Sequence, residues 1–248
     1  MTTDVAWLPL RQELARWRHA GRTAEFWLRD DDAIEPTPAL GRLLRLTGEF
    51  AVPVTLAIIP AYTGEALASS LEAAHTSVAV HGWSHRNHAV DGEKKQELGP
   101  HRPGDVVFEE LSRGLTQVRR LHGQRALPML VPPWNRIESG LLAGLGSIGF
   151  KALSAFGPPR NAPILVINSN VDIIDWHGTR GCRDHTMLVR EVTAQLGRAF
   201  DGGDPVGLLT HHLLHDEAAW SFLQRLFETT ARQGGKWRSA KELLEGSD

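Results

Sequence analysis

Cysteine, long apolar runs and net charge are scarce in this sequence, and each scarcity excludes a class of protein. Cys182 is the only cysteine, which excludes an internal disulfide and a cysteine-rich zinc knuckle. No apolar run approaches the roughly 20 residues that span a bilayer. The formal charge is −2 and the isoelectric point is about 6.6, so the sequence indicates neither a nucleic-acid partner nor an anionic membrane surface.

Residues 1–23 do not show the basic start and continuous apolar stretch of a secretion signal. Charged and polar side chains interrupt the apolar ones, at Arg11, Gln12, Glu13, Arg16 and Arg18. This pattern predicts an amphipathic helix that packs on the rest of the fold. We therefore expect a cytoplasmic protein, and the sequence gives no indication of its oligomeric state.

The chain of 248 residues contains 42% hydrophobic and 23% charged residues, which is typical of a soluble globular protein. A chain of this length is able to bury most of its apolar surface in one core. No repeat or long linker divides the sequence. We expect a single domain over residues 1–248.

Short apolar runs alternate with amphipathic segments along the chain. The runs predict strands over residues 24–29, 53–59, 76–81, 126–131, 151–156, 163–168, 171–176 and 205–210. The amphipathic segments predict helices from Pro38 and over 108–121, 188–196 and 222–229. This alternation is typical of an α/β fold with parallel strands, in which the chemistry lies at the carboxyl ends of the strands.

Three acids, Asp30, Asp31 and Asp32, follow the first predicted strand directly. The apolar residues before them should be buried, which places the acids at the mouth of a barrel. Two adjacent acids at this position are able to take different roles, one as a metal ligand and the other as a base. The alternatives are a solvated charge run and a helix N-cap.

His81 and His85 follow the third predicted strand. If the turn between them is helical, their spacing presents two imidazoles to one ion. With one aspartate they form a set that leaves positions open for water and substrate, as a catalytic metal site requires. His88 is interpreted as a residue behind the ligands or as an exposed one.

Further polar and aromatic residues stand at later strand ends. Pro132 and Pro133 extend the chain and expose Trp134, either as a sugar-stacking surface or as a lid over the core. Asp172 and Asp175 should face different sides of a strand, so that one orients a neighbour while the other caps the next turn.

The last strong strand ends at a group of histidines, namely His211, His212 and His215. A histidine that faces the acids across the mouth is positioned to act as a general acid. The alternative for each of the three is a surface imidazole.

Taken in order, these motifs resemble those of the polysaccharide deacetylase family, the NodB-homology domain of family 4 carbohydrate esterases. The family carries five ordered motifs on a distorted (β/α)7 barrel. Their counterparts between residues 24 and 216 are RDDDA at 29–33, His81 with His85, Pro133 with Trp134, Asp172-x-x-Asp175-Trp176, and Leu209 with His211. Each motif alone is a weak signal, and the order and spacing of all five carry the resemblance.

The resemblance implies a metal-dependent hydrolase that removes an acetyl group from an N-acetylated sugar, an oligosaccharide or a related small amide. It implies Asp32, His81 and His85 as ligands of a divalent metal, with Asp31 as base and His211 as general acid. Zinc is the expected metal, and cobalt, manganese, iron and nickel are alternatives. The substrate groove would then be lined by Pro133, Trp134 and Trp176.

The sequence departs from the family pattern in several places. Gly82 stands where the metal motif usually has Ser or Thr, and Val131 replaces the arginine that precedes the proline motif. Arg29 or Arg136 is expected to take over that arginine's role, together with Asp175, in orienting the base or the acid.

Two assignments within the motifs stay open. The acidic pair is Asp30-Asp31 or Asp31-Asp32, and we prefer the second because Arg-x-Asp-Asp resembles divergent members of the family. His215, in LLHD, also fits the last motif, but His211 is preferred because it follows an apolar strand directly.

Two other functions are compatible with the same residues. Two histidines and a carboxylate also hold Fe(II) in oxygenases, although those usually build the set on a double-stranded β-helix. A barrel that binds a sugar or a metal without turnover is the non-enzymatic alternative, and the missing motif arginine favours it. The plausible base, ligands and terminal histidine favour activity.

Overall fold

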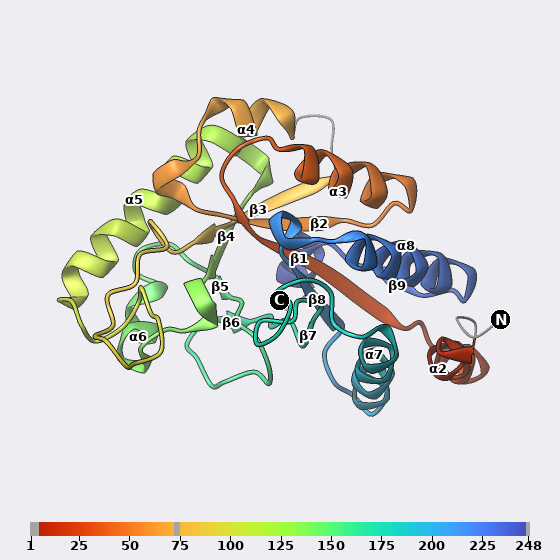
Figure 1. Cartoon of the computed structure of the whole chain (residues 1–248). Helices are drawn as coiled ribbons and strands as arrows, with labels where there is room; N and C mark the ends of the chain where they lie inside the picture. The colour runs from red at the N-terminus through yellow and green to blue at the C-terminus, as the bar shows by residue number, and fades with distance from the viewer. Residues whose placement is uncertain (1–4, 72–74, 247–248) are drawn as a thin grey trace. The chain divides into compact units, whose positions relative to one another are not determined.

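Strands alternate with helices along most of the chain (Figure 1). The structure is a computed structural model that describes residues 5–71 and 75–246. By their internal contacts these residues form two compact units. Unit 1 comprises the residues up to Arg29, Pro38–Val54 and Ser169–Ser239; unit 2 comprises Asp30–Thr37, Thr55–Asn168 and the residues from Ala240 onwards.

Unit 2 contains a sheet in which hydrogen-bonded neighbours follow the order β6-β5-β4-β3-β2-β1. The pairs β3–β4, β4–β5 and β5–β6 are parallel, and the register of the first places His81 opposite Val131. The strands are β1 (Glu25–Ala33, in unit 2 from Asp30), β2 (Val54–Ile58), β3 (Thr76–His81), β4 (Ala126–Val131), β5 (Ala152–Leu153) and β6 (Leu165–Val166). The helices are α4 (Glu65–Ser70), α5 (Gly104–His122), α6 (Leu142–Leu145) and α9 (Ala240–Glu245), with short 3-10 turns such as η1 (Pro60–Tyr62) and η3 (Pro133–Asn135).

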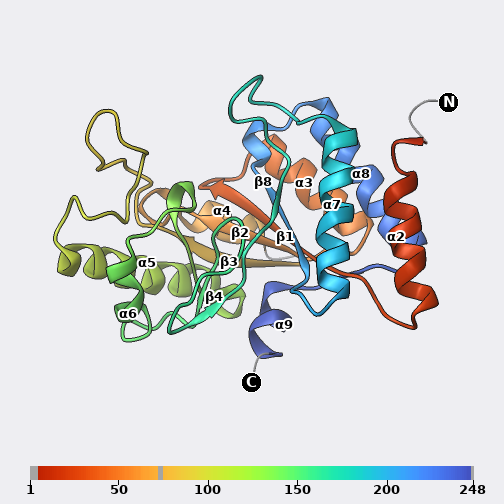
Figure 2. The same cartoon turned by 90° about the horizontal axis from the view of Figure 1, so that it is seen from below.

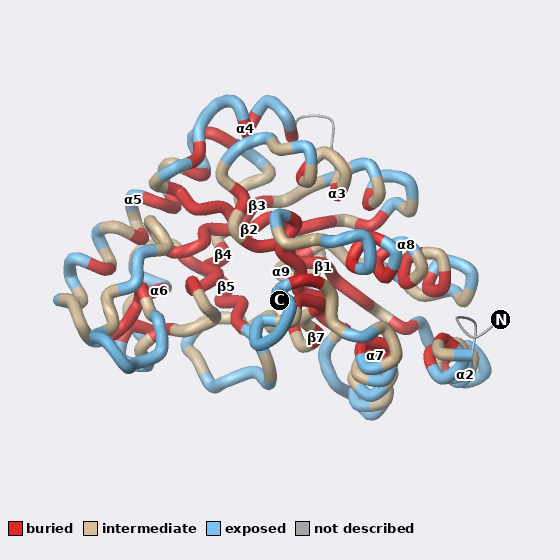
Figure 3. The backbone as a smooth tube through the Cα atoms, viewed as in Figure 1, coloured by how far each residue is buried: buried red, intermediate tan, exposed pale blue. Residues whose placement is uncertain are grey.

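The core of unit 2 lies between this sheet and α5. All residues of β2 are buried, as expected for a largely apolar strand with both faces covered (Figure 3). The buried apolar side chains of α5 repeat at helical spacing and face β3 and β4: Val107, Leu111, Leu115, Val118 and Leu121. Burying each side chain of this size contributes roughly 1.5–3 kcal/mol, so α5 anchors the strands that carry the site residues.

Unit 1 contains the first part of β1, paired in parallel with β9 and hydrogen-bonded to β8, which pairs in parallel with β7. These strands are β7 (Val171–Asp172), β8 (Val206–Thr210) and β9 (Lys236–Trp237), and the helices are α2 (Leu8–His19), α3 (Pro38–Glu49), α7 (His185–Phe200) and α8 (Glu217–Arg232). Helices α2 and α7 lie side by side (Figures 1 and 2), and Trp17 packs edge-on against Phe200 at 5.2 Å between ring centroids.

The observed elements differ from the sequence prediction mainly in the lengths of strands. β1 continues through Ala33, so the three acids belong to the strand and do not follow it. The runs 151–156, 163–168 and 171–176 form only two strand residues each, because irregular backbone follows at once. The helices α4, α6 and α9 and the strand β9 were not predicted; they are too short to produce a periodic pattern.

The prediction of one domain with an amino-terminal helix packed on it stays a prediction; α2 occupies that segment. None of the helices in the described part of the chain combines the length and apolar character needed to cross a bilayer.

His122, the last residue of α5, is a buried imidazole that the proposed chemistry does not use. Its side chain is 3% exposed, and neither ring nitrogen has a hydrogen-bond partner among the described residues. Burial, reinforced by the charge of Arg125, lowers the pKa of His122 to about 4. The folded protein therefore keeps this ring neutral at a pH where the unfolded chain would protonate it.

We predict that the free energy of unfolding falls as the pH is lowered from about 6.5 towards about 4, because the unfolded chain then binds a proton that the folded chain excludes. The contribution of His122 to the free energy of unfolding is fully present above this pH range. It is lost as the pH falls through the range, at no more than about 1.4 kcal/mol per pH unit. His122→Leu should flatten this part of the profile in urea unfolding. His19→Leu, at an exposed position in α2, should keep the wild-type slope. An unchanged slope in His122→Leu would contradict the prediction.

Candidate metal centre

The carboxyl end of β1 separates its three acids by exposure. Asp30 is fully buried and Asp31 is 2% exposed, whereas the side chain of Asp32 is 33% exposed. Asp31 lies close enough to His81 for its charge to raise the pKa of that ring, as the charge of Asp32 also does. Asp32 has φ of 74°, a left-handed conformation that is uncommon for a residue with a side chain. The strand thus ends with one accessible acid beside one buried acid.

The two histidines lie at the end of β3 and in the turn that follows it. His81 is the last residue of β3 and is 2% exposed; His85 is partly exposed. The turn between them is not helical, so that part of the prediction is wrong. Gly82 with φ of 60° and His85 with φ of 56° reverse the chain instead, and the ring centroids come within 5.0 Å.

Asp32, His81 and His85 form a cluster that fits a divalent metal ion. Asp32 Oδ1 lies 3.2 Å from His81 Nε2 and 3.4 Å from His85 Nε2, and one ligand atom from each of the three residues lies within 4.8 Å of the others. Zinc bonds of 2.0–2.1 Å in a tetrahedron require ligand atoms about 3.3 Å apart. Both distances to the carboxylate oxygen meet this requirement.

The hydrogen bond of His81 uses Nδ1 and leaves Nε2 available to bind a metal. Its Nδ1–H donates to the carbonyl oxygen of Val131 at 2.9 Å, so the lone pair of Nε2 faces Asp32. Burial lowers the pKa of His81, but the hydrogen bond to Asp32 and the charges of Asp31 and Asp32 outweigh burial and raise the pKa above its usual value. The cluster therefore favours a positive charge between the ring and the carboxylates.

The pKa of His85 is shifted in the opposite direction from that of His81. Burial and the charge of His81 lower the pKa of His85, against the opposing effect of the charges of Asp32 and Glu97. A lowered pKa keeps this imidazole neutral near pH 7, and the neutral imidazole is the form that ligates a metal.

Pro133 and Trp134, from the predicted groove motif, lie against the turn that carries the histidines. Trp134 stacks at a tilt on His85, with 4.3 Å between ring centroids, and has φ of 54°. Pro133 is buried, and its ring lies against Gly82. Trp134 therefore packs beside a candidate ligand and covers part of the turn.

The two arginines expected to replace the motif arginine have different surroundings. Arg136 donates to the backbone oxygen of Lys95 at 2.9 Å, in an exposed segment. Arg29 is fully buried in β1. Alternation along the strand places Arg29 on the same face of β1 as Asp31.

In unit 1, Asp172, Asp175 and Trp176 form a compact turn after β7. The Trp176 indole N–H donates to Asp172 Oδ2 at 2.7 Å, and the backbone N–H of Thr179 donates to Asp175 Oδ2 at 3.1 Å. Because β7 ends at Asp172, the expected placement of both acids on one strand is wrong. Asp172 orients a neighbour and Asp175 caps a turn.

Of the histidines near the end of β8, His211 follows the strand directly and is 7% exposed. Its ring meets the Trp176 ring edge-on at 4.7 Å between centroids. His215 packs edge-on against Trp220 and precedes Asp216, the N-cap of α8. His215 therefore lies just before α8.

Glu97 is a site residue that the sequence prediction missed. It is fully buried, and its carboxylate contacts the turn between His81 and His85. It lies in an irregular segment without periodicity or motif, so no local sequence signal marks it.

No protein-family model matches the sequence, and no curated protein matches it. Solved structures match along most of the chain. A protein from Mycobacterium smegmatis that is assigned as a polysaccharide deacetylase superposes with a TM-score of 0.69 at 17% identity, with 90% of each chain covered. A peptidoglycan deacetylase from Bacillus subtilis superposes with a TM-score of 0.61 at 16% identity, over 91% of this chain and 92% of the other.

A family 4 acetyl xylan esterase from Clostridium thermocellum, in complex with a cobalt ion, superposes with a TM-score of 0.55 at 13% identity, over 89% of this chain and 90% of the other. At such low identity the likeness is one of fold. The chain has the fold of the polysaccharide deacetylases and family 4 carbohydrate esterases. The predicted α/β class, a distorted barrel of parallel strands, is confirmed.

We predict that the protein purified without chelator holds about one divalent metal ion per chain, because two imidazoles and a partly buried carboxylate converge on one point. The double variant His81→Ala/His85→Ala should lose this metal in elemental analysis. His88→Ala removes a nearby imidazole outside the cluster and should retain it. Stoichiometric metal in the double variant would show that the ion is bound elsewhere.

Proposed function

We propose that this protein is a metal-dependent hydrolase that removes an acetyl group from an N-acetylated sugar, an oligosaccharide or a related small amide. It would be a divergent member of the polysaccharide deacetylases. The observation that carries the proposal is the convergence of Asp32, His81 and His85 at metal-ligand spacing, next to the buried Asp31. The fold shared with deacetylases and with a cobalt-bound esterase supports it.

Asp32, His81 and His85 would hold the ion, which we propose is zinc, with cobalt, manganese, iron or nickel as alternatives. When bound, such an ion supplies an acidified water and a Lewis acid for the amide carbonyl. The exposed parts of Asp32 and His85 leave the cluster open to solvent, so water and substrate are able to reach it.

Asp31 acts as the base and takes a proton from the attacking water. Its burial beside a ligand suits this role, because it excludes competing solvent while the carboxylate stays close to the reacting atoms. Arg29, on the same face of β1, orients Asp31. Asp32 is the acid that faces the histidines, which supports the pair Asp31-Asp32 over Asp30-Asp31.

His211 donates a proton to the departing amine. Its position directly after β8 and its buried ring support this role over His215, which packs on Trp220. Asp175 is proposed to help orient the acid. Pro133, Trp134 and Trp176 are proposed to line the substrate groove, where the two indoles offer apolar surfaces for a sugar ring.

The same ligand set also suits an Fe(II) oxygenase. The parallel β/α arrangement differs from the double-stranded β-helix that usually carries such sites, so we prefer the hydrolase. A small substrate and a cytoplasmic location stay predictions from the sequence.

Release of free amine from N-acetylated sugars and their short oligomers tests the function. We expect release that stops after chelation and returns with zinc or cobalt. Asp31→Asn should abolish turnover but keep the metal, because it removes a base, whereas Asp32→Asn should lose the metal. If Asp31→Asn alone loses the metal, the acidic pair is Asp30-Asp31. If the metal-loaded protein releases no amine from any of these sugars, the hydrolase proposal fails and a binding barrel is favoured.

His211→Ala should lower kcat by about 10²–10⁴-fold with little change in KM or metal content, the usual scale for a lost general acid. His215→Ala is the matched control in the same segment and should stay within a few-fold of wild type. Steady-state kinetics with metal-loaded protein measures both. The reverse ranking would assign the acid to His215.

A further inference from the structure

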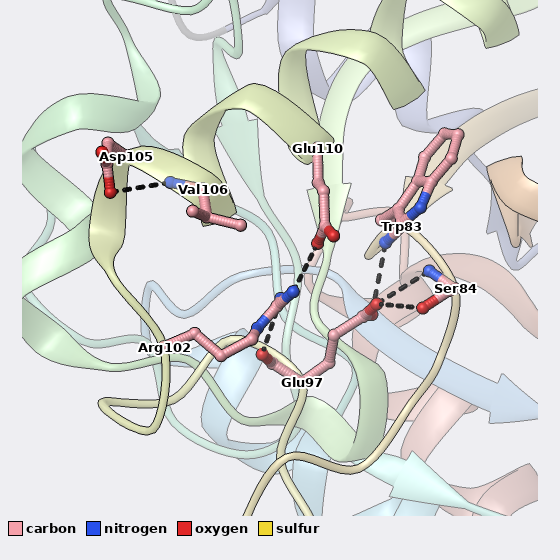
Figure 4. Close-up of polar contacts among 7 residues, drawn as sticks. All are labelled: Trp83, Ser84, Glu97, Arg102, Asp105, Val106 and Glu110. Carbon is pink, nitrogen blue, oxygen red and sulfur yellow. Dashed lines mark hydrogen bonds and ion pairs between the residues drawn. The ribbon is translucent and has the colours of Figure 1, made fainter.

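The carboxylate of Glu97 holds the backbone of the turn that separates the two candidate histidine ligands (Figure 4). The Ser84 N–H donates to Oε1 at 2.7 Å, the Trp83 N–H donates to Oε2 at 3.2 Å, and the Ser84 hydroxyl donates to Oε1 at 3.1 Å. Glu97 is fully buried, so solvent does not compete for these bonds. One side chain thus binds two successive amides between His81 and His85.

The space for this carboxylate exists because residue 82 has no side chain. A Cβ on Gly82 would lie 2.0 Å from Glu97 Oε2 and 2.6 Å from Pro133 Cγ. The φ of 60° at Gly82 also disfavours any residue with a side chain. The Glu97 carboxylate therefore keeps its position only while residue 82 carries no side chain.

Glu97 is itself held in place from two directions. The Arg102 guanidinium donates to the Glu97 carbonyl oxygen at 3.3 Å and pairs with Glu110 of α5 at 2.7 Å (Figure 4). The next residue, Leu98, accepts a hydrogen bond at 2.8 Å from the N–H of Glu138, which follows the Trp134 segment. The carboxylate is therefore fixed against the same framework that supports the turn.

We propose that Glu97 is a positioning residue that sets the geometry of the His81–His85 metal pair by holding the Trp83 and Ser84 amides. The inference rests on the proposed metal site. Glu97 comes from a segment outside the turn, and its buried carboxylate supports the turn conformation that brings His85 next to Asp32. Without that acceptor the part-buried amides of Trp83 and Ser84 lose their partner, and the turn no longer holds His85 in the orientation that binds a metal.

Titration of the metal-free protein with Co²⁺, followed by its visible absorption, tests the proposal. Glu97→Ala should bind Co²⁺ about 10–100-fold more weakly, the usual range for a lost partner behind a metal ligand. Glu97→Gln keeps the size and one acceptor oxygen, and it should fall between Glu97→Ala and wild type. Glu93→Gln, at an exposed position in the same segment where Glu93 pairs with His101, is the matched control and should stay within about 3-fold of wild type.

Two readouts separate positioning from general stability. In the Glu97 variants the shape of the Co²⁺ spectrum should change, a change that altered stability alone does not produce. Gly82→Ala should weaken Co²⁺ binding by itself, and the loss in Gly82→Ala/Glu97→Ala should be smaller than the product of the two single losses, because the displaced carboxylate is already gone.

Wild-type affinity and spectrum in both Glu97→Gln and Glu97→Ala would overturn the proposal, as would independent effects of Gly82→Ala and Glu97→Ala. These results differ from failure of the proposed function, in which the wild-type protein itself takes up no Co²⁺ and the positioning role falls with the metal site. Glu97→Gln, which preserves the packed volume, decides the question if Glu97→Ala does not fold.

Discussion

The pairing of β3 with β4 determines where the candidate metal centre forms. Its register places His81 opposite Val131, and the Val131 carbonyl oxygen accepts the His81 Nδ1 proton. This bond leaves Nε2 to face Asp32, and a slip by one residue would turn His81 to the other face of the sheet. Because a backbone carbonyl is the acceptor, any residue at position 131 would serve this purpose. The arginine of the family motif is therefore not needed to orient the ligand, whatever it does for the base.

Backbone strain gathers around the same cluster. Six residues other than glycine have positive φ in the described part of the chain, and four of them are Asp32, His85, Trp134 and Asn135. Each such conformation costs on the order of 1–3 kcal/mol and persists only where the surrounding structure imposes it. Here the buried strands and the packed face of α5 supply that constraint. Packing thus holds these conformations in place around the cluster.

The sequence predicts what depends on local pattern. Apolar runs locate β1 and the end of β3, and with them the acids and His81 near the carboxyl edge of the sheet, although β1 continues past its predicted end at residue 29 to Ala33. The approach of His85 was predicted for the wrong reason, because Gly82 and His85 reverse the chain without a helix. The choice among three adjacent aspartates depends on contacts with β3, which no local pattern contains. Glu97 could not be predicted at all, since it acts from an irregular segment whose folding depends on those same contacts.

The replacement of a hydroxyl residue by Gly82 changes the charge of the site as well as its shape. In this chain the turn is supported by a buried carboxylate, so Glu97 adds a negative charge to that of Asp32 near His85. An extra anion behind a ligand stabilises a bound cation and increases the basicity of the ligand, and it also weakens the cation's power to acidify water. The proposed hydrolysis would then require a base that works on a less acidic water, which is the role proposed for the buried Asp31. Gly82 is therefore compatible with the proposed hydrolase, because the carboxylate of Glu97 holds the turn and would strengthen the binding of a metal.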